Sequence, residues 1–248
     1  MVGEGFFRDA VERAKQTPSL RVGLHLTLVE GRPVSNPRQI PDLVDAGGLF
    51  STHLARAGFR FFFQPGIRTQ LETEIRAQFE AFHKTGLVLD HANAHNHMHL
   101  HPTVLRLMLK VGKDYGLEAV RLPNEPPWRS SKASGKSLGP RLASWIFLWP
   151  WMSLMRLWLR RARIRHNDFF FGMNDSGAMT RNLILRIMEN LPDGITEICF
   201  HPAMRRSKEI DQSMPGYRHV DEFLALTDEA VLQAARTRNI QRISFSNL

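Results

Sequence analysis

The sequence predicts an α/β fold with parallel strand pairing, and two alternations of helix and strand support this prediction. A helical stripe of apolar residues over 69–84 leads into an apolar run at 87–89, which predicts a buried strand. A second helical stripe, from Val104 to Val111, leads into a strand at 118–122. Helices that alternate with strands in this way favour βαβ units. At 248 residues, the chain is long enough for a single α/β barrel or for two small domains.

The other expected elements follow from the same kinds of pattern. Apolar spacing, caps and turn residues predict, in chain order, a helix over 6–16, a strand over 20–28, a loop over 30–53, a polar loop over 124–140, a helix over 180–191, a strand over 195–200, a last helix capped at 227–229 and a last strand over 240–245. These elements continue the alternation of helix and strand, without an internal repeat.

The composition is that of a globular protein with a basic surface. Hydrophobic residues make up 43% of the chain and charged residues 23%. The net charge of +9 suits a nucleic acid, an anionic membrane or an acidic substrate as partner. The one cysteine, Cys199, excludes a disulfide framework and fits a reducing compartment, and residues 1–5 lack the pattern of a signal peptide. No uncharged apolar stretch reaches the roughly 18 residues expected of a spanning helix.

A cluster of histidines marks the first candidate site. Residues 90–102 hold five of the eleven histidines, all at odd positions: His91, His95, His97, His99 and His101. An extended strand would point these side chains to one face, because alternate residues of a strand share a face. Crowded imidazoles suit a divalent metal or proton transfer. The alternative is a histidine-rich surface loop.

Three histidines occupy equivalent places in the predicted fold. His25, His95 and His201 each follow or end a β-rich run. In a parallel α/β barrel, the carboxyl ends of the strands converge on one mouth, where active sites are built. The three side chains are therefore expected to meet, although each one alone could equally be a buried structural histidine.

The segment 142–165 is rich in tryptophan and arginine. It holds four of the five tryptophans and a run of arginines, namely Trp145, Trp149, Trp151, Trp158, Arg156, Arg160, Arg161, Arg163 and Arg165. Amphipathic rings beside arginines suit the headgroup region of an anionic membrane, and we expect such a peripheral contact. The alternative is a packed helical hairpin with a solvated basic end. Single-stranded nucleic acid is not expected, because the segment is too apolar and too localised.

Three motifs together resemble the YdjC-like carbohydrate deacetylases. They are Val-Gly-Leu-His-Leu-Thr-Leu at 22–28, Asn-Ala-His-Asn-His-Met-His at 93–99 and Glu-Ile-Cys-Phe-His-Pro-Ala at 197–203. Residues 30–34, 40–45, 120–126, 166–172 and 175–177 are similar to the hopanoid-biosynthesis-associated branch of this family (HpnK). The likeness covers nearly the whole chain.

The resemblance implies a fold and a reaction. The fold would be a distorted TIM-like (β/α) barrel of the polysaccharide-deacetylase kind, a single domain over 1–248 with a basic helical insertion at about 141–165. The reaction would be removal of an N-acetyl group from an amino sugar at a divalent metal, Mg²⁺ or alternatively Zn²⁺. By motif, His25 and His95 would bind the metal, and His201 would act as an acid or stabilise the transition state. Side chains expected to contact the substrate or the metal ligands are Asn93, His97, His99 and Arg121.

The same resemblance implies a substrate and a location. The branch is associated with an N-acetylglucosaminyl hopanoid lipid, which would give the tryptophan segment a membrane to contact. We therefore expect a cytoplasmic protein at the periphery of the inner membrane, and a homodimer stays open. Two rival functions also remain: another metal-dependent hydrolase, such as a phosphoesterase, and a non-catalytic barrel that binds a lipid or sugar.

One departure from the family bears on activity. The family opens with a strand that ends in Ala-Asp-Asp-Phe-Gly, whose aspartates supply a metal ligand and the base, and no such motif occurs in this sequence. The early acids are Glu4, Asp9 and Glu12, on or before the first predicted helix. We expect that the first βα unit is missing, as after a late start codon, and that the chain is weakly active. Asn93, where relatives carry aspartate, is a smaller departure.

Overall fold

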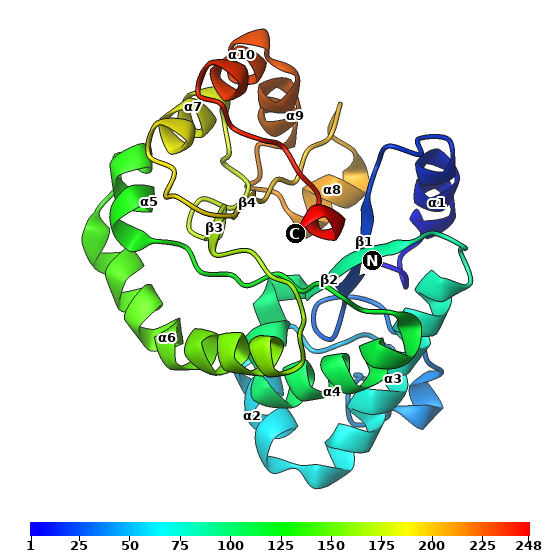
Figure 1. The fold of residues 1–248 in the computed structure, drawn as a ribbon. Helices are drawn as coiled ribbons and strands as arrows, with labels where there is room; N and C mark the ends of the chain where they lie inside the picture. Colours follow the sequence, from blue (N-terminus) through cyan, green and yellow to red (C-terminus); the bar gives the residue numbers. More distant parts are fainter. The chain divides into compact units, whose positions relative to one another are not determined.

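The computed structural model describes all residues from Met1 to Leu248 (Figure 1). The chain divides into two compact units. Unit one comprises Met1–Arg121, Ser153–His166 and Ser244–Leu248, and unit two comprises Leu122–Met152 and Asn167–Ile243. Each unit contains helices and one small parallel sheet, so the mixed α/β class is confirmed.

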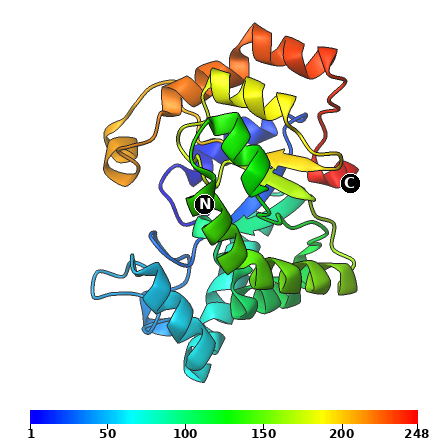
Figure 2. The same ribbon diagram turned by 90° about the vertical axis from the view of Figure 1, so that its left-hand side faces the viewer.

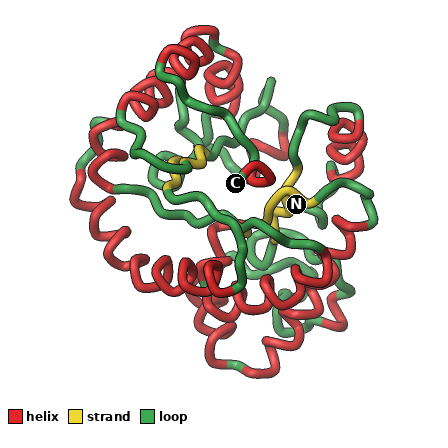
Figure 3. Tube along the Cα trace, in the orientation of Figure 1, coloured by secondary structure: helices red, strands yellow, loops and turns green.

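The sheet of unit one pairs β1 (Val22–Leu26) with β2 (Leu89–Ala94) in parallel (Figure 3). The register aligns His25 with Asn93 and places both near the carboxyl ends of their strands. A single bridge between Ala92 and Val120 continues the ladder beyond β2. This pairing brings the first two motifs of the sequence side by side.

The helices of unit one are α1 (Phe7–Lys15), α2 (Leu54–Phe63), α3 (Pro65–His83) and α4 (Pro102–Gly112), with short 3₁₀ turns at Pro37–Gln39, His95–Leu100, Lys113–Tyr115 and Phe245–Asn247. Helices α3 and α4 pack together through the apolar stripes that the sequence predicts. Helix α3 also buries Glu74 and Gln78. Gln78 bonds both backbone groups of Thr27, and the Glu74 carboxylate accepts two backbone N–H groups, from residues 34 and 35. These bonds fix the course of the chain after β1.

Unit two has its own core. Strand β3 (Phe169–Phe171) pairs in parallel with β4 (Thr196–Ile198), and the helices are α5 (Pro127–Ser134), α7 (Arg181–Glu189), α8 (Lys208–Ser213), α9 (His219–Thr227) and α10 (Glu229–Thr237). Helices α7, α9 and α10 pack against one another (Figure 2). The cap expected at 227–229 is confirmed, because the Asp228 carboxylate accepts the N–H groups of Ala230 and Val231.

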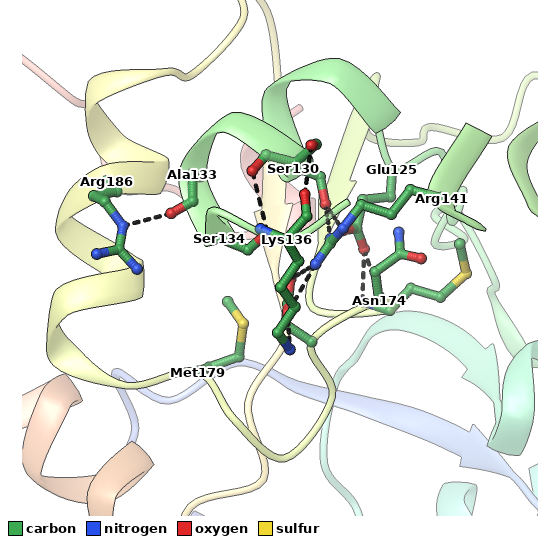
Figure 4. A network of polar contacts seen from close by, with 12 residues as sticks. Glu125, Ser130, Ala133, Ser134, Lys136, Arg141, Asn174, Met179 and Arg186 are labelled. Carbon is green, nitrogen blue, oxygen red and sulfur yellow. Dashed lines mark hydrogen bonds and ion pairs between the residues drawn. The ribbon is translucent and has the colours of Figure 1, made fainter. Parts of the chain in front are cut away.

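A buried polar network fixes the loop that follows β3 (Figure 4). The Glu125 carboxylate accepts the backbone N–H groups of Met173 and Asn174, at 2.8 and 3.0 Å. Arg141 lies between Glu125 and Asp175, and its Nη2 donates to Asp175 at 2.9 Å. All three charged side chains are buried, and Lys136 also pairs with Asp175 at 2.9 Å, so each buried charge has an opposite charge beside it.

Helix α6 (Leu138–Arg161) is one continuous helix that contains Pro150. Residues up to Met152 belong to unit two and the rest to unit one. The packed hairpin that was the alternative for this segment is therefore absent, since the helix does not reverse direction at Pro150. No helix, α6 included, has both the length and the apolarity needed to cross a membrane.

Four expectations need correction. The TIM-like barrel is not confirmed: each sheet has two short strands and neither sheet closes, whereas a barrel needs a ladder between every pair of neighbours. Helix α5 occupies part of the expected loop 124–140, because Pro127 suits the first turn of a helix and Gly135 ends it in the left-handed conformation. No strand forms over 240–245. The histidine-rich strand ends at Ala94, for a backbone reason given below.

Candidate functional site

The ends of β1 and β2 bring His25 and Asn93 into contact. The Nδ1 atom of His25 is hydrogen-bonded to Oδ1 of Asn93. An amide oxygen only accepts hydrogen bonds, so the His25 proton lies on Nδ1 and the lone pair lies on Nε2. Burial lowers the pKa of His25 to about 3, outweighing the Asn93 bond that favours the charged form. At neutral pH, His25 is therefore an uncharged lone-pair donor.

His95 faces that lone pair. Its Nδ1 lies 3.5 Å from Nε2 of His25, and the two rings meet edge to face with centroids 5.6 Å apart. On the other side of the His95 ring, Nε2 lies 3.4 Å from a carboxylate oxygen of Glu30. The same Glu30 oxygen accepts a hydrogen bond from Nδ2 of Asn96 at 2.7 Å.

A left-handed turn ends the strand and separates the five histidines. Asn96 and His97 have φ values of 49° and 53°, in the left-handed region that residues other than glycine rarely adopt. His91 stacks on Phe245, and His101 packs edge-on against the phenyl rings of α2. The expectation that all five share one face is therefore wrong, because an extended strand past Ala94 would have been required.

His99 anchors the turn. It is fully buried, its Nδ1 accepts the Ala94 N–H at 3.0 Å, and its Nε2 lies 3.1 Å from the Arg121 carbonyl oxygen, to which it donates. Burial holds its pKa well below the usual range, so both bonds are made by a neutral ring. His97 is half-buried with its ring 5.9 Å from that of His99, and Arg121 is buried next to the bridge between Ala92 and Val120.

The donor set fits a divalent cation in part. The two ring nitrogens that face each other on His25 and His95 would both donate to a cation, and imidazole suits Zn²⁺ and similar ions better than Mg²⁺, which prefers oxygen. No group of three or more His, Cys, Asp or Glu side chains is gathered in metal-binding geometry anywhere in the chain. If a metal binds here, unit one would contribute two ligands, His25 and His95, and water or substrate would complete the coordination.

His201 lies in unit two, three residues after β4. Its backbone N–H donates to the buried carboxylate of Glu222, and its carbonyl accepts from Nδ1 of His219. The Tyr217 ring meets the His201 ring edge-on at 5.1 Å, and the Tyr217 hydroxyl is 2.8 Å from Oγ of Ser176. These contacts hold the backbone of His201 in place and leave its imidazole beside Tyr217.

Sequence reasoning missed Glu30, Tyr217 and Glu222. Glu30 lies two residues after the predicted strand 20–28, where site residues gather, so its position was a usable signal. Glu222 and Tyr217 reach His201 from a later helix and loop, and nothing in the local sequence indicates that contact.

The tryptophans of α6 differ in their surroundings. Trp145 is half-buried, and its Nε1 donates to Oδ1 of Asn124 at 3.2 Å. Trp149 and Trp151 are exposed, whereas Trp158 is half-buried. Arg160 and Arg161 lie exposed at the C-terminal end of the helix.

Comparison with known proteins decides the family. The profile of the YdjC-like proteins matches residues 1–237. This chain belongs to the YdjC-like family. It is 29% identical to a carbohydrate deacetylase of Brevibacillus brevis, over all of this chain and 86% of the relative, and 26% identical to one of Thermoanaerobacter pseudethanolicus, over 98% and 84%. A solved Enterococcus faecalis structure, assigned provisionally to cellobiose-phosphate cleavage, matches with a TM-score of 0.73 and 23% identity, over all of this YdjC-like chain and 85% of that one. That likeness shows the fold alone.

Proposed function

We propose that this YdjC-like chain is a metal-dependent carbohydrate deacetylase, a hydrolase that removes an N-acetyl group from an amino sugar. Family membership and the two deacetylase relatives support the reaction class. The observation that carries the metal dependence is the close approach of Nε2 of His25 and Nδ1 of His95, which lie 3.5 Å apart. A divalent cation would accept an electron pair from each of these two nitrogens.

The reaction needs two kinds of side chain, namely metal ligands and a proton donor. A bound divalent metal would polarise the amide carbonyl and lower the pKa of a water to about 7 in favourable cases. His25 and His95 would hold it, and Asn93 orients His25 by accepting a hydrogen bond from its Nδ1–H group. Water adds to the carbonyl carbon, the C–N bond breaks, acetate leaves, and the amine takes up a proton. We assign the donation of that proton to His201, whose backbone Glu222 and His219 hold in place.

The test of this function is the identity of the released group. We expect slow but measurable acetate release from N-acetylglucosaminyl lipids, because no carboxylate joins His25 and His95 in a metal-binding group to take the proton from water. His95→Ala should abolish this release. Release of phosphate from phosphorylated sugars without acetate would instead favour a phosphoesterase, and metal binding without any turnover would favour a non-catalytic binding protein.

The surface of α6 supports a lipid substrate. Ile146, Phe147, Trp149 and Trp151 are exposed, with Phe147 at 74% and Trp149 at 52%. Helices normally turn apolar residues inward, so an apolar outer surface indicates a partner. We propose that this partner is an anionic bilayer, since Arg160 and Arg161 end the same helix, and that the substrate is a lipid such as an N-acetylglucosaminyl hopanoid at the cytoplasmic face.

Vesicle binding tests this surface. We expect the chain to co-sediment with phosphatidylglycerol vesicles, less so with phosphatidylcholine vesicles, and less at high salt, because salt screens the arginines. The double variant Phe147→Ser with Trp149→Ser should lose binding. Phe63→Ser, on α2 and 60% exposed, is the matched control and should bind as the wild type does. Vesicle binding by the double variant at the wild-type level would refute the proposal that the exposed side chains of α6 contact the bilayer.

A further inference from the structure

His25 and His95, the two candidate metal ligands, each need a partner for the ring nitrogen that would not face the metal. A histidine presents one lone pair only when the proton is held on the other nitrogen. For His25 that partner is Asn93. For His95 the group beside the second nitrogen is the carboxylate of Glu30, which neither the sequence motifs nor the comparisons assign to any role.

Hydrogen bonds hold the backbone around Glu30, and one further bond holds its carboxylate. Gln78 and Glu74 of α3 bind the backbone on both sides of it, at Thr27 and Val34. The Glu30 backbone N–H donates to the Ser51 carbonyl at 3.2 Å. Asn96, in the left-handed turn after β2, donates to the carboxylate at 2.7 Å. Glu30 itself has a φ of 51°, a backbone conformation that is costly for a residue other than glycine and is maintained here by these bonds.

We propose that Glu30 is a positioning residue that keeps the His95 proton on Nε2 and thereby turns the Nδ1 lone pair toward His25. A carboxylate behind a metal-binding histidine also makes the ring a better electron-pair donor, so Glu30 should raise the affinity for a divalent cation. This inference rests on the proposed function only in that the cation is the one used there. The carboxylate of Glu30 would then act on the metal through His95, and it would not bind the metal itself.

The contrary view is that Glu30 and His95 form an incidental surface pair. Glu30 is 38% exposed, and exposed ion pairs often contribute little. That view predicts no change in the His95 tautomer or in metal binding when the carboxylate is removed. The two views therefore differ in quantities that can be measured without turnover.

The experiment compares Glu30→Gln with the wild-type chain by titration calorimetry with Zn²⁺ alone. We expect Glu30→Gln to weaken Zn²⁺ binding by about 10- to 100-fold, the usual effect of losing such a partner. Glu30→Asp, which keeps the charge but shortens the reach, should restore part of the affinity. Glu72→Gln is the matched control, since Glu72 is a similarly exposed carboxylate of the same unit that pairs with Lys110 on α4.

A second measurement reads the tautomer directly. The ¹⁵N shifts of the His95 ring should show the proton on Nε2 in the metal-free wild type and a shift toward Nδ1 in Glu30→Gln, with Glu72→Gln unchanged. Unchanged Zn²⁺ affinity and an unchanged tautomer in Glu30→Gln would overturn the proposal, as would a wild-type chain that binds no Zn²⁺. Acetate release is scored separately, so the deacetylase function can fail while this inference stands, and the reverse also holds.

Discussion

The most exacting prediction concerns His99, the buried anchor of the turn between β2 and α4. His99→Ala leaves the Ala94 N–H and the Arg121 carbonyl without their partners, which lie at 3.0 and 3.1 Å. An unsatisfied buried group costs about 1–3 kcal/mol, so we expect a loss of about 2–6 kcal/mol in the free energy of unfolding. His99→Asn places Oδ1 where Nδ1 accepts, keeps the Ala94 bond and should lose about 1–3 kcal/mol.

The pH dependence of stability tests the role of His99 in a second way. Burial lowers the pKa of His99 well below 6.5, so the folded chain keeps the ring neutral where the unfolded chain takes up a proton. The stability that depends on this neutral ring is complete above pH 6.5 and declines as the pH falls below it, by about 1.4 kcal/mol per pH unit. Because asparagine does not titrate, the stability of His99→Asn should decline less steeply on acidification by that amount.

Urea denaturation of both variants over a series of pH values is the assay. A loss below about 1 kcal/mol for His99→Ala would show that the two backbone groups find other partners. An equal acid dependence in wild type and His99→Asn would show that His99 is not held neutral in the folded chain. Either result would refute the role of His99 as the anchor of the turn.

Three further predictions concern the buried network, the glycine beside Tyr217 and the partner of His25. Arg141→Met should destabilise unit two by about 3–5 kcal/mol in urea, because the buried Glu125 would lose its cation and the buried Asp175 would keep only Lys136; a loss typical of an exposed ion pair would contradict this. Gly177→Ala should lower the melting temperature, since Gly177 has a φ of 75° and an added Cβ would overlap the Tyr217 ring, and an unchanged temperature would mean that the ring moves freely. Asn93→Ala should weaken Zn²⁺ binding by about 10- to 100-fold in calorimetry, and wild-type affinity would show that His25 needs no orienting partner.

The sequence predicted local elements well where periodicity is strong. The stripe over 69–84 is α3 (Pro65–His83), and the strand 20–28 contains β1. The pairing of His25 with the histidine motif was also predictable, because parallel strands end at a common edge and each motif follows its strand.

The remaining features depend on contacts that no local pattern encodes. The left-handed turn at Asn96 is stabilised by His99 bonding to Ala94 and Arg121, residues separated by up to 22 positions in sequence. The role of Glu30 depends on α3 holding the segment around it. Strand and helix periodicity describe one element at a time, so they could place His95 at a strand end but not choose its neighbours.

The central claim is that His25 and His95 jointly hold a divalent metal that supports hydrolysis of an acetylated amino sugar. The most direct measurement is acetate release by the full chain as a function of added Zn²⁺ or Mg²⁺, compared with His25→Ala, His95→Ala and the exposed His83→Ala as control. We predict release that rises to saturation with one of these ions in wild type and His83→Ala, and none in the other two variants. Acetate release that does not depend on added metal, or that continues at the wild-type rate in His25→Ala and His95→Ala, would contradict the claim.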